Sequence, residues 1–355
     1  MNPSSPPLRL SVLDQSVACL GRGEDEALRD TLALAEAADA WGYERFWVSE
    51  HHGMPTIVGS APEVLLAALA ARTRRIRLGS AGVMLPHYSA YKVAETFRVL
   101  DALAPGRLDL GVGRAPGSDR RTAQALNPHI SGMAEDFPEQ IQDLAAWVSG
   151  RMHQGLVAHP CPPMEDEADA AVAPLDAGNK ASPDRVPQLW ILGSSDYGAR
   201  LAAHLGLPYA FAYFFMDGQG VEQALSLYRS LYRPSARFPK PQATICVWAL
   251  TAPTEAEARF HALSRERWRL DRERGLLRPL LPPSDIEAQG FSEMELARLT
   301  PMRQRAFVGN PEQVSERLRA LASELQLDEL VINTWAYDRQ ARRESYRLLL
   351  DAMRA

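Results

Sequence analysis

The sequence predicts an α/β fold of the (β/α)8 TIM-barrel type, with insertions after strands four and seven. Short apolar runs alternate with helical patterns along the 355 residues, and eight such strand-then-helix pairs follow one another. This alternation is typical of a parallel sheet, and eight strands are the number that closes a barrel. An open doubly wound sheet is the alternative that the pattern leaves. Because such barrels often exceed about 250 residues, we expect residues 1–355 to form a single domain.

In the first half, apolar runs predict strands over residues 8–13, 45–48, 76–81 and 108–113. A helical pattern follows each strand, over residues 24–41, 62–73, 90–103 and 138–149. Gly42 ends the first helix and Pro105-Gly106 ends the third, because glycine and proline both stop helices. The third helix also has an apolar face at helical spacing, formed by Val93, Phe97 and Leu100.

The second half repeats this rhythm. Strands are expected over residues 188–193, 208–213, 243–250 and 329–334, and the last of these completes the eight. Helices are expected over residues 197–205 and 221–232, and further helices begin at Thr254, with a capping-box pattern, and at Asn310-Pro311. The chain closes with a helix whose apolar face is formed by Tyr346, Leu349, Leu350 and Met353.

Two stretches interrupt the alternation. Residues 151–186 are rich in proline and alanine, and residues 269–307 form a long charged insertion after strand seven. Loops of this length are usually lids or disordered segments, and both stretches follow strands at the end of a barrel where active sites lie. We expect a solvated excursion for the first stretch and either a lid or a solvated excursion for the second.

The composition excludes several classes of function. Hydrophobic residues make up 46% of the chain, which is enough to build a core without cross-links. The net charge is −5 and there is no basic stripe, so we expect no nucleic-acid partner. The three cysteines, Cys19, Cys161 and Cys246, are too far apart for a zinc site or a disulfide framework. With no signal-peptide pattern and no apolar run of membrane length, we expect a cytoplasmic protein that does not span a membrane.

In a barrel, functional side chains collect just after each strand. Strand two is followed by Glu50-His51-His52. Adjacent residues point to opposite sides, so we expect only one of the two histidines to face the mouth of the barrel. A pair of solvent-exposed histidines is the alternative. Because adjacent histidines rarely bind one ion and no His-x-His follows strand one, we expect no metal site.

The ends of strands three to five are rich in small residues. Residues 79–86 would let a flat ligand approach the backbone, although tight packing in a barrel explains them equally. The run from Gly111 to Gly117 departs from a dinucleotide fingerprint in its spacing, but it contains Arg114, a fixed cation suited to phosphate. Residues 193–198 lead into a helix and can form an anion site or an ordinary helix cap.

Four sets of residues together carry a family resemblance. They are Glu50-His51-His52, residues 79–86, the segment from Pro105-Gly106-Arg107 to Gly113-Arg114, and residues 189–195. In this combination the chain resembles the luciferase-like flavin-dependent monooxygenases, and within them the stand-alone bacterial members related to the luciferase alpha chain. The resemblance covers nearly the whole chain, including residues 307–311 and 328–338.

The resemblance implies an oxidoreductase that binds reduced FMN and uses O₂ on a small organic substrate. Position by position, it assigns the FMN phosphate to Arg114, Ser194 and Ser195. Backbone contacts to the cofactor are expected at Tyr197 and Gly198. The pair Ala81-Gly82 corresponds to the family's support for the isoalloxazine ring, and we expect the peptide bond between these two residues to be cis. His51 corresponds to the histidine that acts in acid–base catalysis.

The resemblance also has limits. Gly113 stands where luciferase has its reactive cysteine, so light emission is not implied, and His87-Tyr88 departs from the pattern expected where substrate is contacted. NAD(P)H could reduce the flavin directly, or a separate flavin reductase could supply it, and a homodimer is expected from the family. The alternatives are a non-catalytic flavin carrier on the same barrel, a deazaflavin in place of FMN, and a metal-dependent TIM-barrel hydrolase.

Overall fold

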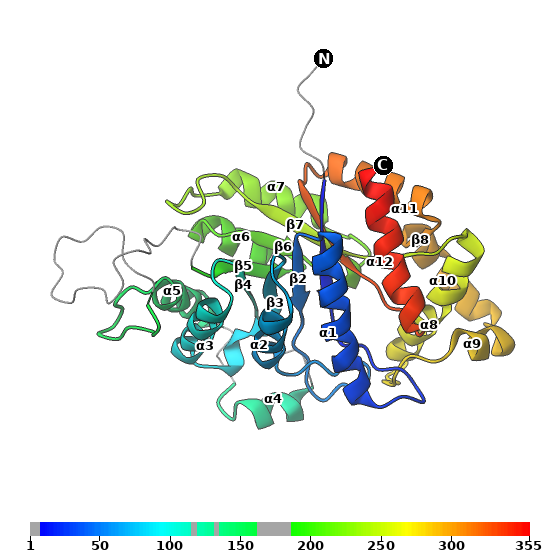
Figure 1. Cartoon of the computed structure of the whole chain (residues 1–355), viewed down its shortest axis with the longest axis horizontal. Helices are drawn as coiled ribbons and strands as arrows, with labels where there is room; N and C mark the ends of the chain where they lie inside the picture. Colours follow the sequence, from blue (N-terminus) through cyan, green and yellow to red (C-terminus); the bar gives the residue numbers. More distant parts are fainter. Residues whose placement is uncertain (1–7, 115–118, 131–134, 162–185) are drawn as a thin grey trace, which may run out of the picture.

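Eight parallel strands close into a barrel in a computed structural model that describes residues 8–114, 119–130, 135–161 and 186–355 (Figure 1). The order is β1-β2-β3-β4-β5-β6-β7-β9, and closure comes from the pairing of β6 with β7 and of β9 with β1. The predicted barrel is therefore confirmed, and an open sheet is excluded. The barrel strands are β1 Arg9–Asp14, β2 Arg45–Val48, β3 Arg77–Met84, β4 Leu108–Gly113, β5 Gln188–Gly193, β6 Tyr209–Phe211, β7 Ala243–Thr251 and β9 Glu329–Asn333.

Twelve α-helices are formed by the described residues, and most of them surround the barrel (Figure 1). They are α1 Glu24–Trp41, α2 Pro62–Arg72, α3 Ala90–Leu103, α4 Arg120–Leu126, α5 Phe137–Val148, α6 Asp196–Leu205, α7 Val221–Leu231, α8 Glu255–Glu273, α9 Pro283–Gln289, α10 Glu293–Arg305, α11 Pro311–Glu324 and α12 Arg339–Arg354. Capping boxes begin α8 at Thr254 and α11 at Asn310, as the sequence indicates. The short helix α4 was not expected.

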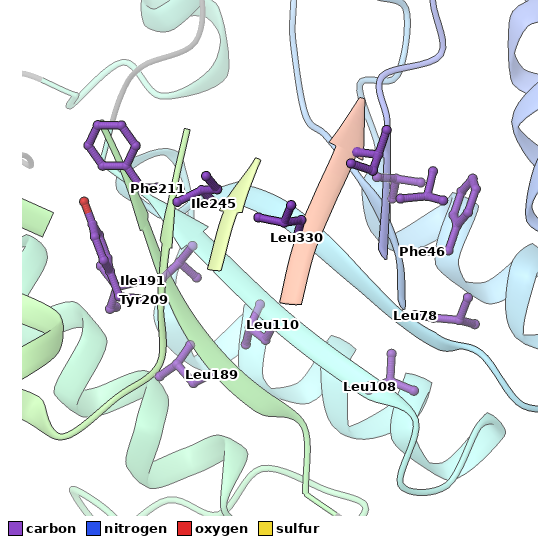
Figure 2. Close-up of a cluster of buried hydrophobic side chains, with 14 of the residues drawn as sticks. Phe46, Leu78, Leu108, Leu110, Leu189, Ile191, Tyr209, Phe211, Ile245 and Leu330 are labelled. Atoms are coloured by element: carbon purple, nitrogen blue, oxygen red, sulfur yellow. The ribbon is translucent and has the colours of Figure 1, made fainter. Parts of the chain in front are cut away.

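The strand side chains alternate between two cores. Those that point outward pack against the helices in the main hydrophobic cluster, and Figure 2 shows the part of it carried by Phe46, Leu78, Leu108, Leu110, Leu189, Ile191, Tyr209, Phe211, Ile245 and Leu330. Those that point inward form a smaller cluster of Leu13, Trp47, Trp190, Ala210, Cys246 and Val331. This is the period-two pattern of a strand buried on both faces.

A layer of buried charges lies inside the barrel near the starts of the strands. Asp109 accepts hydrogen bonds from Arg45 Nη1 at 2.8 Å, from Trp47 Nε1 at 2.9 Å and from Arg77 Nη2 at 2.6 Å. Arg45 also donates through Nε to Glu329 at 2.9 Å. Charges and aromatic rings therefore occupy the lower part of the barrel, below the carboxyl ends of the strands.

The insertion after strand seven is folded and is not a solvated excursion, while its role as a lid stays a prediction. Helix α8 continues past Arg269 to Glu273, so the insertion begins later than expected. It contains α9 and α10, and it ends in a ninth strand, β8 Phe307–Gly309, which pairs with β7 outside the barrel. Arg267 joins α8 to Glu295 of α10 at 2.7 Å. Of the earlier interruption, residues 162–185 lie outside the described residues.

Candidate functional site

A cavity of about 670 Å³ opens at the carboxyl ends of the strands, above the inner aromatic layer. The strand ends β2 to β6 supply most of its wall, which is the edge where barrel enzymes place their sites. Every residue to which the sequence assigned a role lines this one cavity. These residues are His51, Ala81, Gly82, Arg114, Ser194, Ser195, Tyr197 and Gly198.

The cationic part of the cavity lies between β4 and β5. The guanidinium carbon of Arg114, just after β4, lies 4.1 Å from the centroid of the Tyr197 ring in the first turn of α6. Ser195 is the N-cap residue of α6, but its hydroxyl makes no capping hydrogen bond, and both Ser194 and Ser195 are exposed. A helix N-terminus, two hydroxyl groups and a guanidinium thus converge on one region, which is a suitable place for a phosphate.

At the end of β3, the backbone of β3 lies close to the backbone of β4. The peptide bond between Ala81 and Gly82 is cis, as expected from the resemblance. A Cβ atom on Gly82 would lie 2.7 Å from the carbonyl oxygen of Gly111, so only glycine fits there. At Gly113, by contrast, no described atom outside its two neighbours in the chain lies within 4 Å of where a Cβ would be. The cavity is therefore open over β4, with space for a flat ligand.

His51 is half-buried in the wall of the cavity, directly after β2. Its Nδ1 lies 3.2 Å from the hydroxyl oxygen of Ser49. Burial, with smaller electrostatic effects from the nearby His52 and Arg272 side chains, lowers the pKa of His51 to about 4. The imidazole is therefore neutral near pH 7 and has one nitrogen that can donate and one that can accept a proton.

His52 has a different environment from that of His51, as the alternation of neighbouring residues predicts. Its Nε2 lies 2.7 Å from Oε1 of Glu50, a buried carboxylate. Glu50 also accepts hydrogen bonds from the hydroxyl of Tyr88 at 2.6 Å and from the backbone N–H of Met84 at 3.0 Å. Burial, together with this bond to Glu50, raises the pKa of Tyr88. This network ties the loop after β2 to the end of β3 and so fixes the wall that contains His51.

A second cavity of about 730 Å³, here called the outer cavity, adjoins the first. Both are lined by Gln15, His51, Phe214 and Phe215. The outer cavity also has an aromatic wall that the sequence analysis did not identify, formed by Trp248, Trp268 and Trp335. Gln15, Asn333 and Trp335 lie at or just after the ends of β1 and β9, so applying the strand-end rule to those two strands would have found them.

The described residues contain neither a metal-binding cluster nor a membrane-spanning helix. No group of three or more His, Cys, Asp and Glu side chains is placed to hold a metal ion. No helix in the described ranges is both long enough and apolar enough to cross a membrane.

Comparison with known proteins gives a consistent result. Residues 9–328 match the family model described as luciferase-like monooxygenase. An N-acetyl-S-alkylcysteine monooxygenase of Bacillus subtilis is 36% identical over 356 residues, which cover 98% of this chain and 99% of that protein. The crystal structure of apo-MsnO8 is 33% identical, with a TM-score of 0.86 and 98% of each chain covered.

A more distant structure shares the fold. It is the oxygenating constituent of 3,6-diketocamphane monooxygenase from Pseudomonas putida, a type II Baeyer–Villiger monooxygenase solved in complex with FMN. It is 18% identical, its TM-score is 0.64, and the match covers 97% of this chain and 96% of that one.

Proposed function

The chain belongs to the luciferase-like monooxygenase family, and from this premise we propose that it is an FMN-dependent monooxygenase that uses reduced flavin and O₂ to oxidise a small organic substrate. The observation that carries the proposal is the convergence of a phosphate-type site, a shelf of small residues and a neutral histidine on one cavity. Strands β3 and β4 lie between His51 and the serine turn in the barrel order, so the ends of these two strands separate them.

The cavity fits FMN in its chemistry. Arg114, Ser194, Ser195 and the N-terminal N–H groups of α6 would bind the phosphate. The backbone of Ala81-Gly82 would support the ring system, beside the open space at Gly113. The FMN complex of the distant structure supports the same choice of cofactor. When bound, reduced FMN supplies the electrons that activate O₂.

His51 is the residue that we propose for proton transfer. It lies where the two cavities meet, so it can contact both a bound flavin and a molecule in the outer cavity. Because its pKa is low, it enters the reaction as a neutral base, and the Ser49 hydroxyl can stabilise the ring when it takes up a proton. The aromatic residues Phe214 and Phe215 line both cavities and would help to exclude water from a bound flavin.

The proposal also includes the substrate class, the source of electrons, the cellular location and the oligomeric state. We propose a small organic molecule as the substrate, a class to which the N-acetyl-S-alkylcysteine in the name of the Bacillus subtilis relative belongs. Electrons would come from NAD(P)H, either directly or through a separate flavin reductase. We also propose a cytoplasmic homodimer.

An anaerobic titration tests the cofactor. The full-length protein is titrated with reduced FMN, oxidised FMN and reduced deazaflavin, and we expect reduced FMN to bind most tightly. The loaded protein is then mixed with O₂ and a panel of thioethers and ketones that begins with N-acetyl-S-methylcysteine, and products are followed by mass spectrometry with ¹⁸O₂. Incorporation of one labelled oxygen atom supports the proposal. Tight FMN binding without an oxygenated product from any compound would instead indicate a flavin carrier.

A further inference from the structure

Arg265, a residue of α8, is a buried cation in the wall of the outer cavity. The residue is only 8% exposed, although it carries a full guanidinium group. Its guanidinium carbon lies 4.1 Å from the centroid of the Trp248 ring. Stacking of this kind fixes the plane of the group while its N–H donors stay available.

The arginines near Arg265 have carboxylate partners, whereas Arg265 has none among the described residues. Arg269 binds both carboxylate oxygens of Asp217, at 2.8 and 2.9 Å. Arg303 binds both oxygens of Glu266, at 2.8 and 2.6 Å. Asp217 and Glu266, the two acids whose charges act on Arg265, are therefore each paired with another arginine. No hydrogen bond or ion pair from the described part of the chain reaches the guanidinium of Arg265.

An unpaired buried charge is costly, so its presence calls for a partner. Burial, together with the neighbouring charge of Arg269, lowers the pKa of Arg265 to about 9, and the group is still protonated at pH 7. A structural arginine of this burial would normally be held by a carboxylate or by backbone carbonyl groups. Arg265 has neither within the described ranges, so the partner is to be sought in the cavity.

Two further polar atoms, in residues that line the outer cavity, also lack hydrogen-bond partners among the described residues. The indole Nε1 of Trp248 and the side-chain Oδ1 of Asn333 are buried and make no hydrogen bond with any described residue. Both residues line the outer cavity. One is a donor and the other an acceptor, and both are buried within the wall, so they make this wall polar, whereas the guanidinium of Arg265 is the group that we assign to ligand contact.

We propose that the outer cavity binds an organic acid and that Arg265 recognises its carboxylate. The inference rests on the proposed function, because it makes this acid the substrate that is oxidised beside His51. A planar guanidinium matches a carboxylate through two parallel hydrogen bonds. The aromatic wall of Trp248, Trp268 and Trp335 suits an apolar body on the same molecule. Among the charged residues that line the cavity, Arg269, Arg272 and Arg305 are balanced by Asp119, Asp217 and Glu273, so Arg265 is the excess positive charge that would attract an anion.

A smaller cavity, which Arg265 also lines, provides the control variant for this proposal. It has a volume of about 240 Å³, lies between α8 and α10, and is also lined by Arg259. Arg259 is exposed and paired with Glu255 at 2.6 Å. If an acid bound in this smaller cavity, Arg259 would matter as much as Arg265, whereas binding in the outer cavity requires only Arg265.

Calorimetric titration with hexanoate and its neutral analogue hexanamide tests the proposal. Both probes are titrated at pH 7 into full-length protein, with and without FMN. We expect the wild type to bind hexanoate at least about tenfold more tightly than hexanamide, because a charge-assisted pair is lost in the amide. In Arg265→Gln the two affinities should agree within about twofold, whereas Arg259→Gln should keep the full preference for the acid.

Each other outcome is decisive. Equal affinity of the wild type for the two probes, including no measurable binding of either, overturns the proposal without any variant. Equal loss of the preference in Arg259→Gln and Arg265→Gln places the acid in the smaller cavity and also overturns it. If Arg265→Gln does not fold by circular dichroism, Arg265→Lys replaces it and must weaken hexanoate more than hexanamide. Acid selectivity without FMN binding would refute the proposed function alone, and FMN binding without acid selectivity would refute only the acid site.

Discussion

The guanidinium carbon of Arg114 lies 4.1 Å from the centroid of the Tyr197 ring, which joins the end of β4 to the first turn of α6. The ring orients an otherwise exposed cation beside the Ser194-Ser195 turn. Tyr197 therefore has a side-chain role that the sequence did not indicate, since only a backbone contact was expected there. Two residues from different strand ends thus contact each other at the place where we propose that the FMN phosphate binds.

Replacement of Arg114 should distinguish binding of the FMN phosphate from binding of the rest of the flavin. We expect Arg114→Ala to weaken FMN by about tenfold or more, because a charge-assisted bond to phosphate is lost. Riboflavin, which has no phosphate, should bind as before. Tyr197→Ala, which removes only the stacking, should weaken FMN by about fivefold at most. Fluorescence titration measures all of these affinities.

The matched control for Arg114 is Arg200→Ala. Arg200 lies one turn further along α6 and is also exposed, but it does not line the first cavity. It should leave FMN affinity unchanged. If Arg114→Ala weakened riboflavin as much as FMN, the phosphate would not bind at this turn.

Replacement of His51 should affect catalysis and spare cofactor binding. We expect His51→Gln to lower turnover by about 10²–10⁴-fold, the usual loss when a general acid–base is removed. The affinity for FMN should change by no more than a few-fold, because the proposed phosphate contacts lie at β4 and β5. Turnover is followed as oxygenated product on the best compound of the substrate panel.

His52→Gln provides the comparison. His52 lies 2.7 Å from Glu50 and lines the outer cavity but not the cavity proposed for the flavin, so its loss should lower turnover by less than about tenfold. Equal losses in the two variants would remove the distinction that the structure draws between these neighbouring histidines.

His51 should also make the fold sensitive to acid. Burial lowers its pKa from 6.5 to about 4, so between these two values the unfolded chain binds more protons than the folded chain. Stability therefore falls as the pH falls from 6.5 to 4, by at most about 3 kcal/mol from this residue, and is unaffected by it above pH 6.5. Urea unfolding at pH 7 and pH 4.5 should show a smaller difference for His51→Gln than for the wild type. An identical difference in both proteins would show that His51 titrates normally.

The fold was largely predictable because each barrel strand is a compact apolar run next to a helix. The parts that were missed are short or depend on distant contacts. Strand β8 has three residues and exists because it pairs with an extension of β7, which no local pattern announces. Helix α4 has seven residues and is held at its start by the side chain of Asp119, which caps two backbone N–H groups.

The candidate site also contains residues that the sequence predicts and residues that it does not. His51, Arg114 and the serine turn directly follow strands, so their convergence follows from the barrel itself. The cis bond at Ala81-Gly82 came from family resemblance, because the small residues there are equally compatible with a trans bond. Arg265 could not be predicted, since it lies within a helix of mixed charge, and only the packing of α8 across the barrel shows that it is buried and unpaired.

Asp109 should matter for folding and little for the cofactor. Burial acts to raise the pKa of this carboxyl, but Arg45 and Arg77 outweigh it and hold the pKa below its usual range. Asp109→Asn removes the negative charge that both guanidinium groups share, and breaking a buried pair from one side costs about 3–5 kcal/mol. The free energy of unfolding in urea should fall by about this amount. The exposed pair of Glu36 and Arg72 sets the scale, since Glu36→Gln should cost no more than about 1 kcal/mol.

Because Asp109 lies five residues before Arg114 and near the start of β4, the folded variant should bind FMN within a few-fold of the wild type. The fluorescence titration used for Arg114→Ala decides this point. A loss of FMN affinity in Asp109→Asn as large as that in Arg114→Ala would mean that the ionic layer shapes the cavity through Trp47, which donates to Asp109 and lines the cavity wall. Stability loss without affinity loss is the outcome expected from a barrel whose lower layer supports the fold and whose upper layer binds the ligand.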